Sequence, residues 1–203
     1  MTIERGAAWG SAQPLPQNGV IARSDTDAAA AVSSARARGT TIPSIGLLGG
    51  DLCRTLGGNG DERRLRSADA VTLPVDIAEV ELDGAPRVFV AHVVARRSWW
   101  RGRVWVAMNA EWIGDWDVAP RAHPGDGLLD VFDVSLSLRD RVKARRRLRT
   151  GTHVPHPHIA QIRATSADAE FTERVGVWVD GHHVGDARSI SVRVTGEVVD
   201  VVV

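Results

Sequence analysis

The sequence contains a single lysine, Lys143, and a single cysteine, Cys53. A Walker-type phosphate loop requires Gly-Lys-Ser/Thr at a helix start and protein kinases require a strand lysine, so the lysine content excludes both designs. A lone cysteine cannot form an internal disulfide, which fits a reducing compartment. No apolar run approaches the roughly 18 residues of a membrane-spanning helix, and the N-terminus lacks a basic stretch followed by an apolar one. We therefore predict a cytoplasmic protein.

The chain also lacks net charge. Twenty-five basic and 25 acidic residues cancel in the 203-residue sequence, and the charges balance within each half as well. Any attraction to nucleic acid or to an anionic membrane must therefore come from a local cluster of charges. Hydrophobic residues make up 43% of the sequence, which is enough to form a buried core.

The hydrophobic pattern of the first 70 residues indicates one strand–helix–strand unit followed by a helical stub. The expected elements lie at residues 20–22, 27–38, 43–48 and 52–56. Asp25 or Thr26 is the expected N-cap of the long helix, and Gly39 follows its last turn as a C-cap. We therefore predict a small α/β domain over residues 1–70.

From residue 71 onward the pattern becomes that of a β-protein. Short apolar or alternating runs predict strands at residues 71–73, 77–82, 88–94, 104–108, 128–136, 175–179, 189–194 and 198–203. Asp83-Gly84 predicts a hairpin turn between two of them. One helix is expected at residues 138–149. The whole chain is thus predicted to be α+β, with an antiparallel β-sandwich-like domain over residues 71–203.

Several motifs of this second part occur in a characteristic order. They are Val106-Ala107-Met108-Asn109-Ala110, Ala119-Pro120, Asp126-Gly127-Leu128-Leu129-Asp130, Gly151-Thr152-His153 and Val177-Trp178-Val179-Asp180-Gly181. An Asp-Gly pair that leads into a strand is by itself most often only a turn. Together, however, the motifs resemble the C-terminal domain of bacterial diacylglycerol kinases and related lipid kinases. The resemblance implies ATP- and Mg²⁺-dependent transfer of a phosphoryl group to a hydroxyl of diacylglycerol or a similar lipid.

The resemblance also implies that the first part derives from a nucleotide domain similar to that of NAD kinases. In this family a Gly-Gly-Asp-Gly-Thr loop lets the backbone approach the ATP phosphates closely, and a Gly-Thr-Gly-Asn-Asp loop follows it. The matching segment of the first loop keeps only its aspartate, as Asp25. The second matches Leu47-Leu48-Gly49-Gly50-Asp51, in which the last glycine and the aspartate persist as Gly49 and Asp51, with Gly50 between them. These four residues are the expected nucleotide site, although the first loop has lost its glycines.

The family's catalytic element is an Asp-Gly-Glu turn whose glutamate acts as general base on the lipid hydroxyl. Here the matching residues are Asp180, Gly181 and His182, so the resemblance assigns Asp180 and His182 to catalysis and Asp126 to a cation network. A histidine can act as a base near neutral pH, but it brings no negative charge to a cation, and a surface turn residue is the alternative. The segments before the first loop and between the strands at 88–94 and 104–108 are shorter than in relatives. An inactive lipid- or partner-binding module is therefore the alternative function.

Two cationic stretches suggest what the chain contacts. Residues 139–149 carry seven cations, among which Arg145, Arg146 and Arg147 are assigned to an anionic membrane, with Leu138, Val142 and Leu148 as the expected apolar anchors of the helix. A solvated helix is the alternative. Five tryptophans interleaved with arginines lie upstream: Trp99, Trp100, Trp105, Trp112 and Trp116. Three interpretations stay open. The rings and arginines contact the membrane interface, or the rings stack on nucleic-acid bases, or the rings pack in the core while the arginines lie at a solvated surface or a dimer interface. We expect a lipid or the inner membrane face as partner, allow a homodimer, and expect no nucleic acid.

Overall fold

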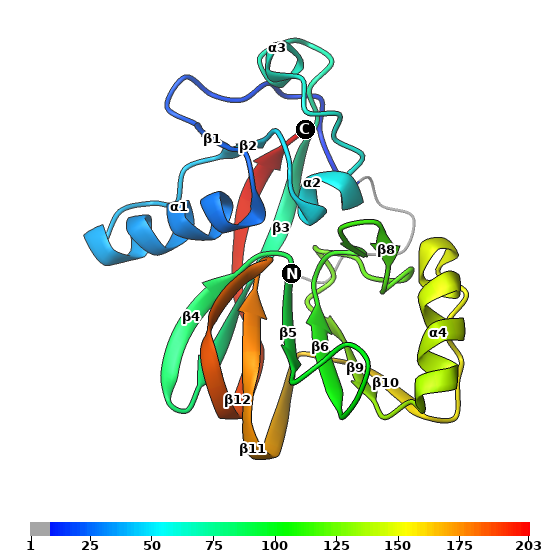
Figure 1. The fold of residues 1–203 in the computed structure, drawn as a ribbon. Coiled ribbons are helices and arrows are strands. Elements are labelled where there is room, and N and C mark those ends of the chain that lie inside the picture. Colours follow the sequence, from blue (N-terminus) through cyan, green and yellow to red (C-terminus); the bar gives the residue numbers. More distant parts are fainter. Residues whose placement is uncertain (1–8) are drawn as a thin grey trace.

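A computed structural model, shown in Figure 1, describes residues 9–203. Its strands are β1 (Val20–Ala22), β2 (Ile45–Leu47), β3 (Thr72–Leu82), β4 (Ala85–Phe89), β5 (His92–Arg96), β6 (Val104–Met108), β7 (Trp112–Ile113), β8 (Trp116–Asp117), β9 (Leu129–Val134), β10 (Ile159–Ala164), β11 (Ser166–Val179) and β12 (His182–Val202). Its helices are α1 (Asp25–Arg38), α2 (Asp51–Thr55), α3 (Glu62–Leu65) and α4 (Leu138–Arg147), which continues into a short 3-10 turn, η1 (Leu148–Thr150). The predicted α+β class is confirmed.

One large sheet runs through both parts of the chain. Its strand order is β1-β2-β12-β11-β5-β6-β9-β10, and β3 and β4 extend it from β12. The β1–β2 and β2–β12 pairs are parallel, whereas the β-domain pairs are antiparallel. Because β2 pairs with the end of β12, the N-terminal unit continues the sheet of the C-terminal part, and the division at residue 70 stays a prediction. In Figure 1, α1 lies at the left of the view beside β1 and β2, and α4 lies at the right beside β9 and β10.

The capping residues of α1 determine where the helix begins and ends. Ser24 is the N-cap, and its side chain accepts a hydrogen bond from the Asp27 amide. Gly39 ends the helix with a left-handed φ of 63°. The predicted C-cap, Gly39, is confirmed. The predicted N-cap, Asp25 or Thr26, is wrong, because Ser24 caps the helix. Because Ser24 caps α1, the Asp25 carboxylate is available to accept hydrogen bonds from the backbone of another helix.

Two hairpins of the sheet close through the same turn chemistry. Asp83-Gly84 joins β3 to β4, and Asp180-Gly181 joins β11 to β12, each as a two-residue loop. All four residues have positive φ, 47° and 88° in the first turn and 48° and 81° in the second. This is the backbone of a type I′ turn, for which Asp-Gly is a preferred sequence. The predicted hairpin at Asp83-Gly84 is confirmed.

Several predicted strand limits were wrong. The runs at 71–73 and 77–82 form the single strand β3, and those at 189–194 and 198–203 belong to the long strand β12, which has a register shift between Val194 and Val198. The run at 88–94 splits into β4 and β5. The two-residue strands β7 and β8, the edge strand β10 and the one-turn helix α3 had not been predicted. The strands β7 and β8 and the helix α3 are too short to display a period. In β10 every residue after the first is at least partly exposed, so the strand lacks an alternation of buried and exposed positions.

The buried side chains form layers around the sheet. One cluster lies between α1 and the β2, β3 and β12 strands and includes Val32, Ile45 and Val75. A second fills the space enclosed by the strands of the β-domain and includes Phe89 and Ile190. A third lies beneath α4. Within residues 9–203, no helix combines the length and apolarity that crossing a bilayer requires.

Candidate functional site

The Asp25 carboxylate caps the short helix α2. Its Oδ2 accepts a hydrogen bond from the Asp51 amide at 2.6 Å, and its Oδ1 accepts one from the Leu52 amide at 3.0 Å. The side chain is 4% exposed. Burial and the nearby charge of Asp180 raise the pKa of Asp25 to about 6, although the two amides partly offset this. A predicted nucleotide residue thus carries an internal structural role.

Asp51 connects this cap to a buried histidine that the sequence had not suggested. Its Oδ2 lies 2.8 Å from His92 Nε2, and its Oδ1 accepts the Gly114 amide at 2.8 Å. Burial lowers the pKa of His92, but the hydrogen bond to Asp51 and the charges of Asp180, Asp51 and Asp25 outweigh it, so that the net shift is upward. His92 is therefore a candidate proton carrier next to the predicted nucleotide residues.

The Asp180 carboxylate accepts hydrogen bonds from three backbone amides and, within residues 9–203, from no side chain. Oδ2 accepts the Val90 amide at 3.0 Å, and Oδ1 accepts the Ala91 and His92 amides at 2.9 and 3.1 Å. Burial raises the pKa of Asp180, and His92 and these amides oppose the shift in part. The carboxylate therefore holds the start of β5 against the β11–β12 turn.

His182 lies at the surface next to this turn. Its Nδ1 is 2.7 Å from Thr26 Oγ1, and the Thr26 hydroxyl is 3.1 Å from the Asp180 carbonyl, to which it donates. The Thr26 hydroxyl thus bridges His182 Nδ1 and the Asp180 carbonyl. This bridge joins the turn to the first turn of α1.

The fold thus brings together predicted residues from the two ends of the sequence. Asp25, Asp51, His92 and Asp180 form what we call the carboxylate cluster. One ligand atom each from Asp25, Asp51 and His92 lies within 4.8 Å of the others, which makes these three a candidate metal group. Their carboxylate oxygens, however, already accept backbone amides or face the imidazole. Mg²⁺ prefers oxygen ligands and several waters, so the group fits this ion poorly.

The glycines of the second loop lie close to other parts of the chain. A Cβ on Gly49 would lie 2.6 Å from the Arg23 carbonyl, and one on Gly50 would lie 2.4 Å from Asp25 Oδ1. Both glycines are therefore needed for packing against the chain itself. The amides at the start of α2 are occupied by a carboxylate, whose charge would repel phosphate. The residues present do not fit ATP at this position.

The structure places Asp126 outside the carboxylate cluster. Its side chain forms an ion pair with Arg163 and accepts the Leu128 amide at 3.0 Å. The next residue, Gly127, donates its amide to the buried Asp76 carboxylate at 2.7 Å. Asp126 therefore fixes the loop that precedes β9, and its assignment to a cation network stays a prediction.

The β7–β8 hairpin is attached to α2 next to the cluster. The Arg54 guanidinium stacks 3.7 Å over the Trp112 ring, and its Nη1 donates to the Gly114 carbonyl at 2.6 Å. Thr55 Oγ1 accepts the Glu111 amide at 2.9 Å. The same hairpin contributes side chains to a pocket beneath α4.

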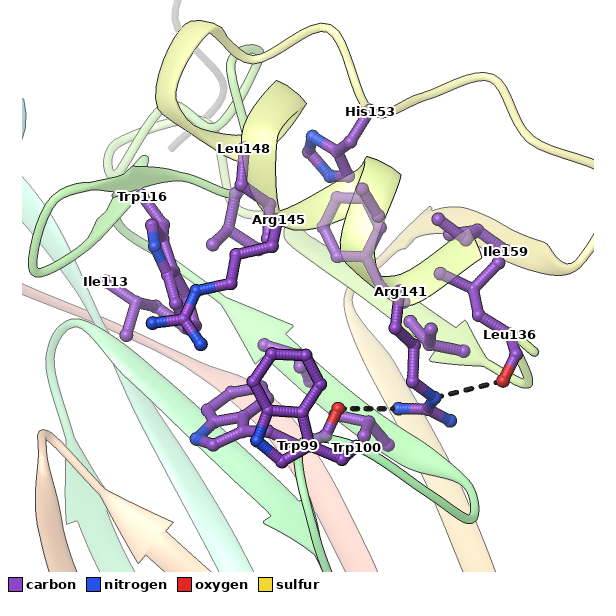
Figure 2. Close-up of a pocket in the computed structure, with 16 residues that line it drawn as sticks. Trp99, Trp100, Ile113, Trp116, Leu136, Arg141, Arg145, Leu148, His153 and Ile159 are labelled. Atoms are coloured by element: carbon purple, nitrogen blue, oxygen red, sulfur yellow. Dashed lines mark hydrogen bonds between the residues drawn. The ribbon is translucent and has the colours of Figure 1, made fainter. Parts of the chain in front are cut away.

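This pocket is the second candidate site and is almost entirely apolar. It has a cavity volume of about 100 Å³ and lies between α4, the β6 and β9 strands, and the indoles of Trp99, Trp100 and Trp116 (Figure 2). Trp99 and Trp116 pack edge to face with ring centres 5.3 Å apart. Trp105, in contrast, is 2% exposed and belongs to the core of the β-domain.

Two of the three predicted anchors of α4 were wrong, whereas Leu148 packs into the cluster beneath the helix as expected. Leu138 and Val142 are 62% and 43% exposed, whereas Arg141, at 6%, is the most deeply buried residue of the helix. Its guanidinium donates to the carbonyls of Leu136, Trp99 and Gly102, so that it anchors the helix through hydrogen bonds. An arginine can pack its aliphatic stem as an apolar residue does, which a hydrophobic pattern does not count.

The three arginines predicted to touch a membrane are exposed, as is their neighbour Trp100. The Arg145 guanidinium lies 5.2 Å from the Trp100 ring centre and 5.5 Å from that of Trp116, at the mouth of the pocket. Arg146 and Arg147 point to solvent. The structure brings Arg145 to the pocket and does not bring any of the three to the carboxylate cluster.

Comparisons with known proteins agree on the fold. The family model for the YegS C-terminal NAD kinase beta sandwich-like domain matches residues 73–203. A solved structure described as "a putative diacylglycerol kinase from Bacillus anthracis str. Sterne" superposes with a TM-score of 0.60 at 15% identity, covering 79% of this chain and 68% of the other. A second such structure gives a TM-score of 0.56 at 15% identity, covering 75% and 66%. The chain thus spans about two thirds of their length. No curated protein matches it.

Proposed function

The chain belongs to the family of the YegS C-terminal NAD kinase beta sandwich-like domain, and from this premise we propose that it is a catalytically inactive relative of the lipid kinases that docks on anionic membranes through α4. Kinship with this family was the expectation from the sequence, and it is confirmed. The family implies ATP and a divalent metal in general. Whether this chain uses them depends on its own residues.

The carboxylate cluster supports the loss of phosphoryl transfer. Asp25 occupies the amides at the start of α2, and Asp180 is saturated by three buried amides. Phosphoryl transfer depends on positioning and charge stabilisation of the phosphate chain. Here the carboxylates of Asp25 and Asp180 accept hydrogen bonds from the protein's own backbone amides. His182 stands where the family has the carboxylate that acts as base. The inner membrane face is the expected place of action.

The observation that carries the membrane proposal is the outward face of α4. Leu138 and Val142 lie one turn apart on this face and are 62% and 43% exposed. Arg139 and Arg146 flank Val142 at helical spacings of three and four residues. Among the residues that the structure describes, neither arginine has an ion-pair partner. Apolar side chains ringed by cations match the chemistry of an anionic lipid surface, at which each near-surface cation contributes about 1 kcal/mol.

Sedimentation with vesicles tests this proposal. The protein should pellet with phosphatidylcholine vesicles that contain phosphatidylserine and remain in solution with phosphatidylcholine alone. The double variant R139Q/R146Q should bind about 30-fold more weakly, because two near-surface cations are worth about 2 kcal/mol. R87Q/R188Q, which removes two exposed arginines from the β-domain, is the matched control and should bind as the wild type does. Equal pelleting of both double variants would contradict the proposal.

Kinase activity is the second candidate, because Asp25, Asp51 and Asp180 converge in the positions that the resemblance assigns. Labelled ATP, Mg²⁺ and diacylglycerol vesicles should give no labelled lipid. Label that disappears in His182→Ala would instead establish a kinase, and this exposed residue can be replaced without disturbing the core. ATP with Mg²⁺ should leave the melting temperature unchanged, because only a ligand that binds the folded state stabilises it.

A further inference from the structure

Two arginines of the loop between β5 and β6 have acidic partners, whereas Arg96, at the end of β5, has none. Arg97 pairs with Glu173 at 2.8 Å. Arg103 donates to both carboxylate oxygens of Asp133, at 2.9 and 2.7 Å. Among residues 9–203, no carboxylate lies within ion-pair distance of the Arg96 guanidinium, and none of its N–H groups has a hydrogen-bond acceptor. Arg96 is therefore a cation that the fold leaves uncompensated.

Two tryptophans cover the faces of this guanidinium. Its central carbon lies 3.8 Å from the Trp178 ring centre and 4.4 Å from that of Trp99. The face of an indole attracts a cation, but it accepts no hydrogen bond in the plane of the guanidinium. The stack therefore holds the group in one orientation and leaves its five in-plane N–H groups unmatched.

The N–H groups of Arg96 differ in their access to solvent. Nε is shielded from solvent and has no partner in the described part of the chain. The side chain as a whole is half-buried, and its two Nη groups are not closed off in the same way. Together these two groups form a fork that matches a pair of oxygens on a carboxylate or a phosphate. The end of the fork is thus the part that a ligand can reach.

The sheet and a neighbouring ring keep the stack in place. Gly176 of β11 pairs with Arg96 of β5, and Figure 1 shows the two strands side by side. A Cβ on Gly176 would lie 2.8 and 2.9 Å from two carbons of the Trp178 ring, so the absence of a side chain makes room for this ring. Trp99 meets the Trp116 ring edge to face, with ring centres 5.3 Å apart. The fork is therefore positioned before any ligand arrives, which lowers the cost of binding.

A fixed cation with an open fork suits an anion. We propose that Arg96 is an oxyanion-binding residue, whose two Nη groups hold the carboxylate or phosphate group of a soluble ligand at the edge of the Trp99–Trp178 stack. Neither Arg96 nor Trp178 lines the pocket beneath α4, so the two sites are distinct. The inference also goes beyond the docking of α4 on a bilayer, because this ligand is bound from solution.

Stabilisation by simple anions tests the proposal. Inorganic phosphate and acetate are the probes, chloride at equal ionic strength is the reference, and thermal unfolding reports binding to the folded state. At least one probe should raise the melting temperature of the wild type more than that of Arg96→Gln. Phosphate also stabilises proteins by its exclusion from their surface, so the difference between the two proteins is the result that counts. A larger difference with acetate indicates a carboxylate ligand, and a larger one with phosphate indicates a phosphorylated ligand. Equal shifts in both proteins would overturn the proposal.

A second measurement follows the arginine itself and uses the wild type, so it stands even where a variant is unstable. The Nε–H group of Arg96 is shielded from solvent and flanked by two indoles, and it should give a distinct signal in proton–nitrogen correlation spectra. Arg96→Lys identifies the signal by its loss. Titration with phosphate or acetate should move this signal until it saturates. A signal that neither probe moves would rule out binding at Arg96.

Two variants show whether the fork or only the charge is needed. Arg96→Lys keeps a positive charge without the fork, and we expect it to bind the preferred probe about tenfold more weakly in titrations followed by tryptophan fluorescence. Arg97→Gln removes the neighbouring arginine that Glu173 already neutralises, and this matched control should bind as the wild type does. An equal loss of affinity in both variants would show that the anion responds only to general positive charge.

The oxyanion site and membrane docking fail independently. R139Q/R146Q removes cations of α4 that are remote in sequence from Arg96, so it should lose vesicle binding and keep the response to the anionic probe. A wild-type protein that responds to the probe but does not pellet with vesicles would refute membrane docking alone. One that pellets with vesicles but responds to neither phosphate nor acetate would refute the oxyanion site alone.

Discussion

Replacement of Asp180 by alanine should destabilise the protein severely. The carboxylate accepts the Val90, Ala91 and His92 amides at 2.9–3.1 Å, and all three donors are buried. A buried donor that loses its acceptor costs about 1–3 kcal/mol, and removal of a buried carboxylate relieves part of the desolvation cost. We therefore expect a loss of roughly 3–6 kcal/mol, against a total stability of about 5–15 kcal/mol for typical proteins.

Backbone strain adds to this loss and can be separated from it. Asp180 has a φ of 48°, where an alanine side chain costs about 1 kcal/mol and a glycine does not. Asp180→Gly should therefore be about 1 kcal/mol more stable than Asp180→Ala. Asp83 is the matched control, because it has a φ of 47° in the same type of turn and accepts the Arg188 and Ser189 amides at 3.0 and 2.9 Å. That turn is exposed, so water replaces the lost carboxylate and the loss should be much smaller.

Urea unfolding followed by circular dichroism measures these differences by linear extrapolation, with an unchanged m-value as the check on two-state behaviour. Asp180→Ala within 1 kcal/mol of the wild type, or no more destabilised than Asp83→Ala, would refute a structural role for this carboxylate. A second readout follows from electrostatics. The charge of Asp180 raises the pKa of Asp25, so its removal should lower that pKa.

Three further predictions concern other buried groups. The folded pKa of Asp25, about 6 against 3.8 for a free side chain, means that its contribution to stability is complete below pH 3.8 and is lost as the pH rises through 6. The free energy of unfolding should therefore fall by about 2–3 kcal/mol between pH 4 and 6, and Asp25→Asn should flatten this slope in urea titrations. Gly50→Ala should cost about 2 kcal/mol or more, since Gly50 has a φ of 97° and a Cβ there would meet Asp25. Gly57→Ala, with a φ of 75° and open space, should cost only about 1 kcal/mol, and urea unfolding of both variants measures the difference. Burial raises the pKa of Cys53, so its thiol should react with Ellman's reagent only as the protein unfolds, and rapid reaction in the folded state would contradict the described packing.

The elements that could be predicted from sequence are those specified by local chemistry. Both Asp-Gly hairpins depend only on two residues that tolerate positive φ, and the end of α1 depends on Gly39 alone. His92 could not be predicted as a site residue. It sits in a valine-rich strand, and its partner Asp51 is 41 residues away, so the pair exists only after β5 and α2 have been brought together by the sheet.

The error at α4 has a similar physical origin. The hydrophobic pattern assigned Leu138 and Val142 to the core and all cations to water, although Arg141 is the residue that is buried. The acceptors of its guanidinium include Trp99 and Gly102, in the loop between β5 and β6. No sequence pattern near Arg141 identifies these acceptors. A helix whose anchor is polar is free to expose its apolar residues, and that exposure is what makes its outward face suitable for a membrane.

The aspartates that match the family's motifs illustrate why a preserved residue is no proof of a preserved reaction. A carboxylate close to backbone amides can serve two ends: it can organise an active site, or it can satisfy the amides themselves. Asp25 and Asp180 do the second in this fold, at the start of α2 and of β5. Their removal would leave buried amides without acceptors, so they have a structural reason to remain even without catalysis. For this reason the assays that matter are those in which stability and activity are measured on the same variant. A loss of activity in Asp180→Ala alone would not distinguish a catalytic residue from a structural one.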